Sequence, residues 1–319
     1  SPTPEPKVKV RSKDGRDRPD PTCVSAPKPK ATVPYWHAAV ALNDFDGDQA
    51  ADLALFRTDT ATWHVRYAAP GEDAIVSWRK QEGTDIPVPG DYDGDGKADF
   101  ATWRPSNGTW YIRSSTGKDR VIPLGDHGDF PAPADYDGDG ITDLALFEAH
   151  DGGWIVRPSS GGQVSLPDEP FGDSVHGDIP VPGDYDGDGK DDVAYYRSST
   201  GDWNVWLSTS GPVDVRWGDP EDGPHPVPGD YDGDGRFDYA VWDAHGSVWK
   251  IKPSNGDDSY EVEWGDRSLA DHPVAGDYTR DGTSDFTVWR ETEGEWRVKP
   301  ADGTRVRVTA WGKTGDTPL

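Results

Sequence analysis

A short acidic pattern recurs along this sequence, with aspartates alternating with turn-forming residues. The second copy reads DYDGDGKAD over residues 91–99 and has aspartates at positions 1, 3, 5 and 9 of the stretch. Two carboxylates 4 Å apart repel each other by roughly 4 kcal/mol at an effective dielectric constant of about 20. Four carboxylates in one short turn therefore predict a bound cation. The alternative, a turn that carries charge only for solubility, leaves this repulsion uncompensated.

The side chains of the pattern favour calcium over other metals. Carboxylates at positions 1, 3 and 5, a main-chain carbonyl at position 7 and Asp at position 9 offer only oxygen ligands, and glycine at position 6 permits a sharp bend. Ca²⁺ accepts about six to eight oxygens in a flexible loop, whereas Mg²⁺ prefers a smaller octahedral shell. Zinc would require His or Cys. The first half resembles an EF-hand loop, but the closing carboxylate comes too early and no helices are expected on either side.

Five copies predict about five structural calcium sites, and a sixth copy is damaged. The copy at Asp44 has Gln49 in place of glycine; it is expected to bind, and weaker affinity is left open. The copy at Asp277 has Thr279 and Arg280 in place of Asp and Gly, and is expected to be empty or weak. The predicted ligands, of which the non-acidic residues contribute carbonyls, are Asp44, Asp46, Asp48, Asp52, Asp91, Asp93, Asp95, Lys97, Asp99, Asp135, Asp137, Asp139, Ile141, Asp143, Asp184, Asp186, Asp188, Lys190, Asp192, Asp230, Asp232, Asp234, Arg236 and Asp238.

The acidic pattern belongs to an internal repeat. Successive copies start 47, 44, 49, 46 and 47 residues apart, and a tryptophan follows each copy at similar intervals. In the second copy, residues 99–105 and 109–115 alternate and are rich in aromatic and β-branched residues, which is typical of strands. The turn SNG between them indicates a hairpin.

Each copy supplies four short strands, because an extended stretch precedes the acids and residues 120–125 follow the hairpin. Four antiparallel strands in one repeat are typical of a β-propeller blade. We therefore predict an all-β propeller of six four-stranded blades over residues 36–319, with seven blades as the alternative. The recurring tryptophans are expected to fill the core between blades.

Residues 1–35 differ from the rest of the chain. They are rich in Pro and Lys and carry a net charge of +4, within a chain whose formal charge is -27. This composition predicts an extended linker. The alternative is a docking arm that binds a protein partner, either by adding KVKVRS as an edge strand or through an intermolecular disulfide of Cys23.

Charge and composition exclude several classes of function. A strongly acidic chain lacks the basic patch that nucleic acid requires, and no apolar run is long enough for a transmembrane helix. The 15 tryptophans argue against a disordered acidic chain. The single Cys and the absence of Met indicate an exported, processed chain or an excised piece. Exposed calcium loops also suit the high calcium concentration outside the cell, so we expect a secreted or cell-surface protein.

The stretch VPGDYDGDGKAD, followed by FATWRPSNGTWYIR, resembles the FG-GAP/VCBS repeat family, which includes the calcium-binding blades of the integrin α-subunit head. The resemblance covers about residues 36–319. It implies a β-propeller that holds Ca²⁺ in the loop between the first two strands of a blade. Integrin-type propellers usually have seven blades, whereas six are counted here. Members of the family serve as adhesion modules, lectins and accessory domains of enzymes.

The first functional hypothesis is a glycan- or cell-surface-binding module, because clefts between blades repeat aromatic and polar groups suited to sugars. The alternative is a protein-binding subunit of a secreted toxin or adhesin assembly, docked through residues 1–35. A third hypothesis, ranked below these, is an accessory domain of a polysaccharide-active enzyme. No catalytic motif is recognised, so we expect no enzyme activity. The candidate sugar-binding residues are Trp103, Arg104, Tyr196, Arg197, Trp206, Trp289 and Arg290. The alternative is that the rings belong to the core between blades and that the charged groups beside them are exposed.

Overall fold

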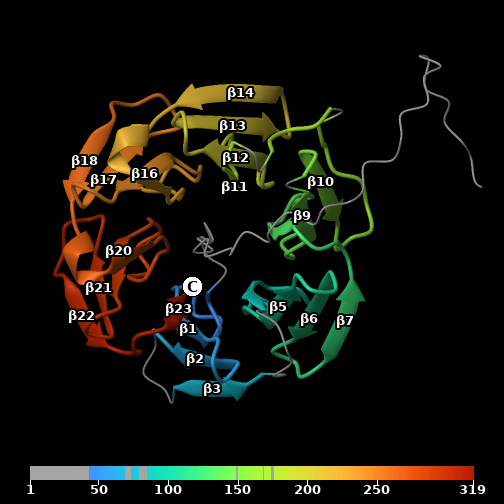
Figure 1. Cartoon of the computed structure of the whole chain (residues 1–319), viewed down its shortest axis with the longest axis horizontal. Helices are drawn as coiled ribbons and strands as arrows, with labels where there is room; N and C mark the ends of the chain where they lie inside the picture. Colours follow the sequence, from blue (N-terminus) through green and yellow to red (C-terminus); the bar gives the residue numbers. More distant parts are fainter. Residues whose placement is uncertain (1–42, 69–72, 79–84, 149, 168, 174–175) are drawn as a thin grey trace, which may run out of the picture. The chain divides into compact units, whose positions relative to one another are not determined.

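The described strands of the computed structural model form six antiparallel sheets arranged in a ring (Figure 1). The structure describes residues 43–68, 73–78, 85–148, 150–167, 169–173 and 176–319. Each sheet is one blade, so the predicted all-β propeller with six blades is confirmed, and the alternative of seven is wrong. Residues 1–35, with the predicted arm and Cys23, lie outside the described residues.

Five blades have the four strands expected from the sequence, and blade 3 has three within the described residues. Blade 1 comprises β23 (Asp316–Pro318), β1 (Leu53–Arg57), β2 (Thr62–Arg66) and β3 (Ala74–Ser77), and blade 2 comprises β4 (Ile86–Pro87), β5 (Phe100–Arg104), β6 (Thr109–Arg113) and β7 (Asp119–Pro123). Blade 3 comprises β8 (Phe130–Pro131), β9 (Leu144–Glu148) and β10 (Gly153–Arg157), and blade 4 comprises β11 (Asp178–Pro180), β12 (Val193–Arg197), β13 (Asp202–Leu207) and β14 (Gly211–Arg216). Blade 5 comprises β15 (Pro224–Pro226), β16 (Tyr239–Asp243), β17 (Val248–Lys252) and β18 (Tyr260–Glu263), and blade 6 comprises β19 (Asp271–Val274), β20 (Phe286–Arg290), β21 (Glu295–Lys299) and β22 (Arg307–Ala310).

The two ends of the propeller meet in blade 1. Strand β23, close to the chain end, supplies the first strand of this blade and pairs antiparallel with β1. Figure 1 shows both strands at the inner side of the ring. Arg57 and Asp316 reinforce the junction through a bidentate ion pair whose shorter N–O distance is 2.7 Å. The ring is therefore closed by hydrogen bonds between residues more than 250 positions apart.

Blade 3 departs from the prediction of four strands, because its sheet contains three within the described residues. The stretch that would form its outer strand contributes Val164 and Leu166, which pack against the core of this blade. Ser165 accepts a hydrogen bond from the Trp206 indole of blade 4 at 3.4 Å. Side-chain packing thus covers the edge of β10 where other blades have a hydrogen-bonded strand.

The repeated tryptophans form the core of the ring, as predicted. Five of them, Trp63, Trp110, Trp203, Trp249 and Trp296, have no exposed surface, whereas the sixth is half-buried in the three-stranded blade 3. They contact rings from the same blade and from the next. Burying large rings supplies the apolar contact area that this polar chain otherwise lacks.

Helical structure is almost absent from the described residues. It is confined to two short 3-10 turns, η1 (Pro220–Asp222) and η2 (Arg267–Leu269). No helix of this part of the chain is long and apolar enough to span a membrane.

Candidate functional site

The acidic stretches form six loops, each of which leads into the second strand of a blade; in blades 2 to 6 the loop also follows the first strand of the same blade. We name them by their first residue: loop 44 (44–52), loop 91 (91–99), loop 135 (135–143), loop 184 (184–192), loop 230 (230–238) and loop 277 (277–285). In loop 91, Asp91 accepts main-chain hydrogen bonds from Gly94 at 2.7 Å and Gly96 at 2.8 Å. All six loops share this arrangement. In each loop the main chain therefore curves around the carboxylate of the first aspartate, because its N–H groups donate hydrogen bonds to that carboxylate.

Five loops bring three carboxylates close together. In each of these, one oxygen from each of three aspartates lies within 4.8 Å of the other two. The triads are Asp44, Asp46 and Asp48; Asp91, Asp93 and Asp99; Asp135, Asp137 and Asp143; Asp184, Asp186 and Asp192; and Asp230, Asp232 and Asp234. These are the five loops predicted to bind calcium. Loop 277 forms no such group among the described residues.

The donor set of these five loops fits Ca²⁺. All candidate side-chain ligands are carboxylates, which are hard oxygen donors. In loop 184, the Oδ1 atom of Asp186 is buried without a hydrogen-bond partner, and a buried carboxylate oxygen without a partner is costly unless a cation is nearby. Residue Gln49 of loop 44 has a φ of +70°, a conformation strained for a non-glycine residue. This agrees with the expectation that loop 44 is a poorer version of the site.

Loop 277 keeps the shared main-chain shape without the acidic triad. Asp277 accepts hydrogen bonds from the N–H groups of Arg280 at 2.6 Å and Gly282 at 2.8 Å. The Thr279 hydroxyl donates to Asp285 at 3.2 Å, so a neutral group occupies the place of the third carboxylate. The loop conformation therefore forms without the acid at position 3, although Asp281 at position 5 is retained.

The aspartate at position 9 has a structural role that the sequence does not reveal. Asp99 is fully buried and accepts main-chain hydrogen bonds from Tyr92 at 3.0 Å and from Ser115 at 2.7 Å. Ser115 lies in the turn between the third and fourth strands, so the carboxylate ties that turn to the acid loop. The same bracket occurs in all six loops, at Asp52, Asp99, Asp143, Asp192, Asp238 and Asp285. The bracket is present in loop 277 as well, so it forms without the carboxylate triad.

These bracket aspartates predict an unusual dependence of stability on pH. Burial raises the pKa of Asp99 to about 6 and that of Asp192 to about 7, and neighbouring loop aspartates add to the shift. The metal-free native state therefore binds protons more tightly than the unfolded chain. This contribution to stability is complete below the unfolded pKa, near 4, and is lost as pH rises through 6 to 7.

We therefore expect the melting temperature in EDTA to fall between about pH 5 and pH 8. Excess calcium should abolish most of this fall, because the cation compensates the negative charge. Thermal unfolding monitored by tryptophan fluorescence measures both series. A melting temperature in EDTA that stays constant or rises over this range would contradict the assignment.

Neighbouring acid loops are linked around the ring. The N–H of Ala98 in loop 91 donates to the main-chain oxygen of Asp44 at 2.7 Å. The same bond, from position 8 of one loop to position 1 of the preceding loop, occurs at every blade junction: Ala51 to Asp277, Ala98 to Asp44, Thr142 to Asp91, Asp191 to Asp135, Phe237 to Asp184 and Ser284 to Asp230. These six hydrogen bonds connect all six acid loops around the ring. A change in the conformation of one loop is therefore expected to affect the loop of the neighbouring blade.

The structure contradicts the sugar-binding role of the candidate rings and confirms the alternative, a place in the core, for three of them. Trp103, Tyr196 and Trp289 have no exposed surface, and a buried ring cannot stack on a sugar. Trp206 is half-buried and meets Phe171 of blade 3 edge-on, with ring centroids 6.2 Å apart. These rings pack the core or a blade junction, because side chains alternate along a strand and these positions point inward.

The arginines beside these rings hold the first two strands of a blade together. Arg104 pairs with Asp85, and Arg290 pairs with Asp271, each through two hydrogen bonds of 2.6 to 2.9 Å. Both guanidinium groups are buried, whereas Arg197 keeps a quarter of its side chain exposed in its pair with Asp178. Arg104 is therefore a structural residue, while Arg197 and Arg290 also border clefts.

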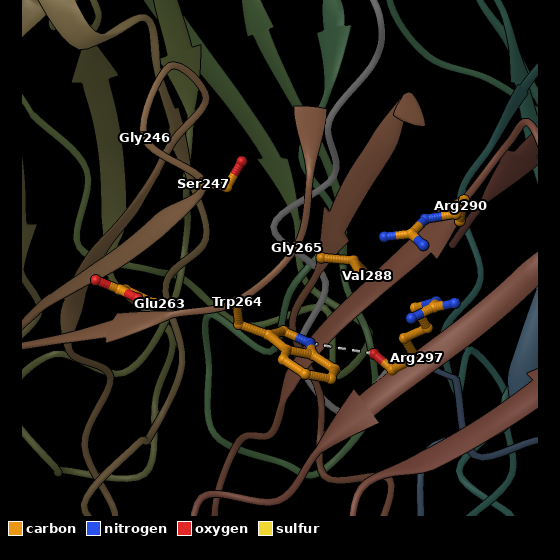
Figure 2. A pocket seen from close by; sticks show the side chains of 8 residues that line it. All are labelled: Gly246, Ser247, Glu263, Trp264, Gly265, Val288, Arg290 and Arg297. Atoms are coloured by element: carbon orange, nitrogen blue, oxygen red, sulfur yellow. Dashed lines mark hydrogen bonds between the residues drawn. The ribbon is translucent and has the colours of Figure 1, made fainter. Parts of the chain in front are cut away.

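A cleft of about 290 Å³ lies between blades 5 and 6. Strand ends and hairpins line it, at the ends of the blades away from the acid loops. Figure 2 shows Ser247 and Glu263 on one side and the guanidinium groups of Arg290 and Arg297 on the other, with Trp264 between them. The Trp264 indole is half-buried and donates to the main-chain oxygen of Arg297 at 3.4 Å, which fixes the ring at the junction.

The charges of this cleft are largely balanced. Asp271 neutralises Arg290, and Glu295 accepts from Arg297 at 3.1 Å. The Nε atom of Arg297 is buried without a hydrogen-bond partner, so the cleft contains an unused donor. Donors, acceptors and an aromatic ring without net positive charge suit a neutral ligand rich in hydroxyl groups.

A second, more open cleft of about 550 Å³ lies at the junction of blades 3 and 4. Gly172, Tyr195 and Arg197 line it, at positions equivalent to Gly265, Val288 and Arg290. Sequence reasoning therefore identified two arginines that border clefts but missed Trp264. A recurring aromatic-Gly-Asp signal, at 171–173, 217–219 and 264–266, marks the junction ring and was available in the sequence.

Comparison with known proteins supports the repeat and the fold. Residues 91–146 match the FG-GAP-like repeat. A search of curated protein sequences found no significant match. Among solved structures, an Agrocybe aegerita lectin specific for non-reducing terminal N-acetylglucosamine is 15% identical, with a TM-score of 0.53, and the match covers 84% of this chain and 91% of the lectin. Virginiamycin B lyase from Staphylococcus aureus is 8% identical, with a TM-score of 0.50 and coverage of 83% and 86%. Identities this low show similarity of fold alone.

Proposed function

We propose that this FG-GAP-repeat propeller is a secreted, calcium-stabilised module that binds neutral glycans in clefts between blades. The observation that carries glycan binding is the cleft between blades 5 and 6. It combines the half-buried Trp264 ring with arginine donors and the acceptors Ser247 and Glu263. An aromatic face and a few fixed polar groups are what a sugar ring requires.

Calcium binding is supported by the five acidic triads and by the fit of their donors. The residues that would hold the ion are the aspartates at positions 1 and 3 of the five loops. The third carboxylate of the triad comes from position 5 in loops 44 and 230, and from the bracket aspartate at position 9 in loops 91, 135 and 184. When bound, the ion would supply positive charge against the clustered carboxylates. Exposed loops of this kind saturate where free calcium is abundant, which supports an extracellular location.

The fold by itself does not select the function. The similar folds include a lectin and a lyase, and unrelated activities commonly share a fold. The alternative of a protein-binding subunit depends on residues 1–35, which lie outside the described residues, and it stays a prediction. The absence of enzyme activity is likewise still a prediction.

Trp264→Ala is expected to weaken glycan binding by about tenfold or more, because it removes a stacking face worth about 0.5–1.5 kcal/mol together with its buried area. A glycan array that includes terminal N-acetylglucosamine, followed by calorimetry on the best ligand, measures the effect. Trp206→Ala is the matched control, since that half-buried tryptophan lies outside this cleft and should leave affinity unchanged. An array without any binder, or equal affinity for Trp264→Ala, would refute the proposal.

A further inference from the structure

The turn between the third and fourth strands covers the acid loop of the same blade. In blade 4, the turn residue Ser208 donates its N–H to the bracket carboxylate of Asp192 at 2.7 Å. The side chains of Ser208 and of the next residue, Thr209, also reach the loop. The Ser208 hydroxyl donates to Asp188 Oδ2 at 2.6 Å, and Thr209 donates to Asp186 Oδ2. The two acids at positions 5 and 3 are thus each held by one hydroxyl.

The same pair of contacts recurs in blades 2 and 3. Thr116 Oγ1 lies 2.7 Å from Asp93 Oδ2, and the Ser115 hydroxyl donates to Asp95. In blade 3, Ser159 and Ser160 occupy the same positions and donate to the acids at positions 5 and 3 of loop 135. We call each pair of turn side chains the clamp of its loop.

Blade 5 has a variant of the clamp. Asn255 Nδ2 donates to Asp232 Oδ2 at 2.9 Å, which replaces the second hydroxyl by an amide. The Ser254 hydroxyl, equivalent to Ser208, is buried without a partner. The clamp of blade 5 therefore holds the acid at position 3 through Asn255, and the Ser254 hydroxyl makes no hydrogen bond to the acid at position 5.

The clamp is present only where the acidic pattern is complete. Ala68 and Ala301 replace its first residue in blades 1 and 6, whose acid loops are the imperfect loops 44 and 277. Both alanines keep the main-chain bond to the bracket, at 2.7 Å for Ala68 and 3.3 Å for Ala301. The turn therefore folds without the hydroxyl. In blades 2, 3 and 4 the role left for the hydroxyl is its hydrogen bond to the acid at position 5.

Building on the proposed calcium binding, we propose that the clamp residues are positioning residues for the ion. In blades 2, 3 and 4 the clamp fixes one oxygen of each acid at positions 3 and 5 before the ion arrives, and in blade 5 it fixes the acid at position 3. In loop 184, the clamp holds Asp186 Oδ2, while Oδ1 of the same carboxylate is buried without a partner and available to a cation. Loops 91, 135, 184 and 230 should accordingly bind more tightly than loop 44.

The test compares two double variants of blade 4. Ser208→Ala/Thr209→Ala removes the clamp of loop 184, and Ser198→Ala/Ser199→Ala changes two hydroxyls in the hairpin at the other end of the blade. Partners of this kind typically alter metal affinity by about 10–100-fold. Competition titration with a fluorescent chelator should show that, in the clamp variant, the dissociation constant of one calcium site rises by at least about tenfold. The control should match the wild type, and both variants should melt near the wild-type temperature in EDTA.

Each outcome is informative. A wild-type chain that binds no calcium would refute the proposed function itself. A wild-type chain that binds, with a clamp variant of equal affinity, would overturn only the clamp. A clamp variant with unchanged or higher affinity and a lower melting temperature in EDTA would also overturn it, because the hydroxyls would then substitute for the ion.

Discussion

Removal of calcium is expected to lower the melting temperature of this protein by about 20 °C or more. A ligand at a concentration about 100 times its dissociation constant stabilises the native state by about 2.7 kcal/mol per site, so five sites supply on the order of 13 kcal/mol. For a chain of this size, about 1 kcal/mol corresponds to roughly 2 °C. The effect should extend beyond the loops, because a hydrogen bond joins each loop to the next at every blade junction.

Differential scanning calorimetry with excess calcium and with EDTA measures this shift. Re-addition of calcium should restore the melting temperature, and Mg²⁺ at the same concentration should restore less of it, since it prefers a smaller shell with retained water. Equal melting temperatures in calcium and EDTA would show that hydrogen bonds alone stabilise the loops. Loop 277 has the same main-chain hydrogen bonds without the acidic triad, so a single loop can adopt this conformation without the triad.

Replacement of the bracket aspartate Asp285 by alanine is expected to destabilise the protein by about 2–6 kcal/mol, both in calcium and in EDTA. Asp285 is fully buried and accepts main-chain hydrogen bonds from Tyr278 at 2.8 Å and Ala301 at 3.3 Å. The substitution leaves two N–H groups without partners, and each costs about 1–3 kcal/mol. Because loop 277 lacks the acidic triad, calcium should not change the size of the loss.

Urea unfolding of three variants separates the structural role from the metal-binding role. Asp192→Ala removes the bracket of loop 184 and should cost as much as Asp285→Ala in EDTA, but more in calcium, because one site is lost as well. Asp302→Ala changes an exposed aspartate of blade 6 and should leave stability close to that of the wild type. If Asp285→Ala were as mild as Asp302→Ala, the bracket would not stabilise the fold.

The sequence predicted the blades well because their signals are local. The alternation of residues and the hairpin turns are visible within a single repeat. Because the pattern recurs about every 47 residues, the strands assigned in one copy support those assigned in the others. The acid loops were predictable for the same reason, since the aspartates that form each triad lie within nine residues. The damaged loop 277 was recognisable from two substitutions.

Contacts between separate turns, strands and blades were not predictable in this way. The bracket joins position 9 to a turn 16 residues later, and the clamp joins positions 3 and 5 to residues 23 and 20 positions away, respectively. For Trp206, Trp103 and Tyr196 the sequence left two interpretations open, a sugar-binding ring at the surface or a ring in the core. Only the direction of each side chain on its strand decided that they pack against the core or against blade 3.

The amino-acid sequence alone thus determined the all-β class, the six repeats and the position of the acid loops, because these depend on neighbours along the chain. The tertiary structure decided the closure of the ring by β23, the bracket and clamp, and the cleft at Trp264. These features depend on which turns and blades meet in space. The strand register and the curvature of the ring determine which turns and blades are in contact, and the sequence of a single repeat does not contain that information.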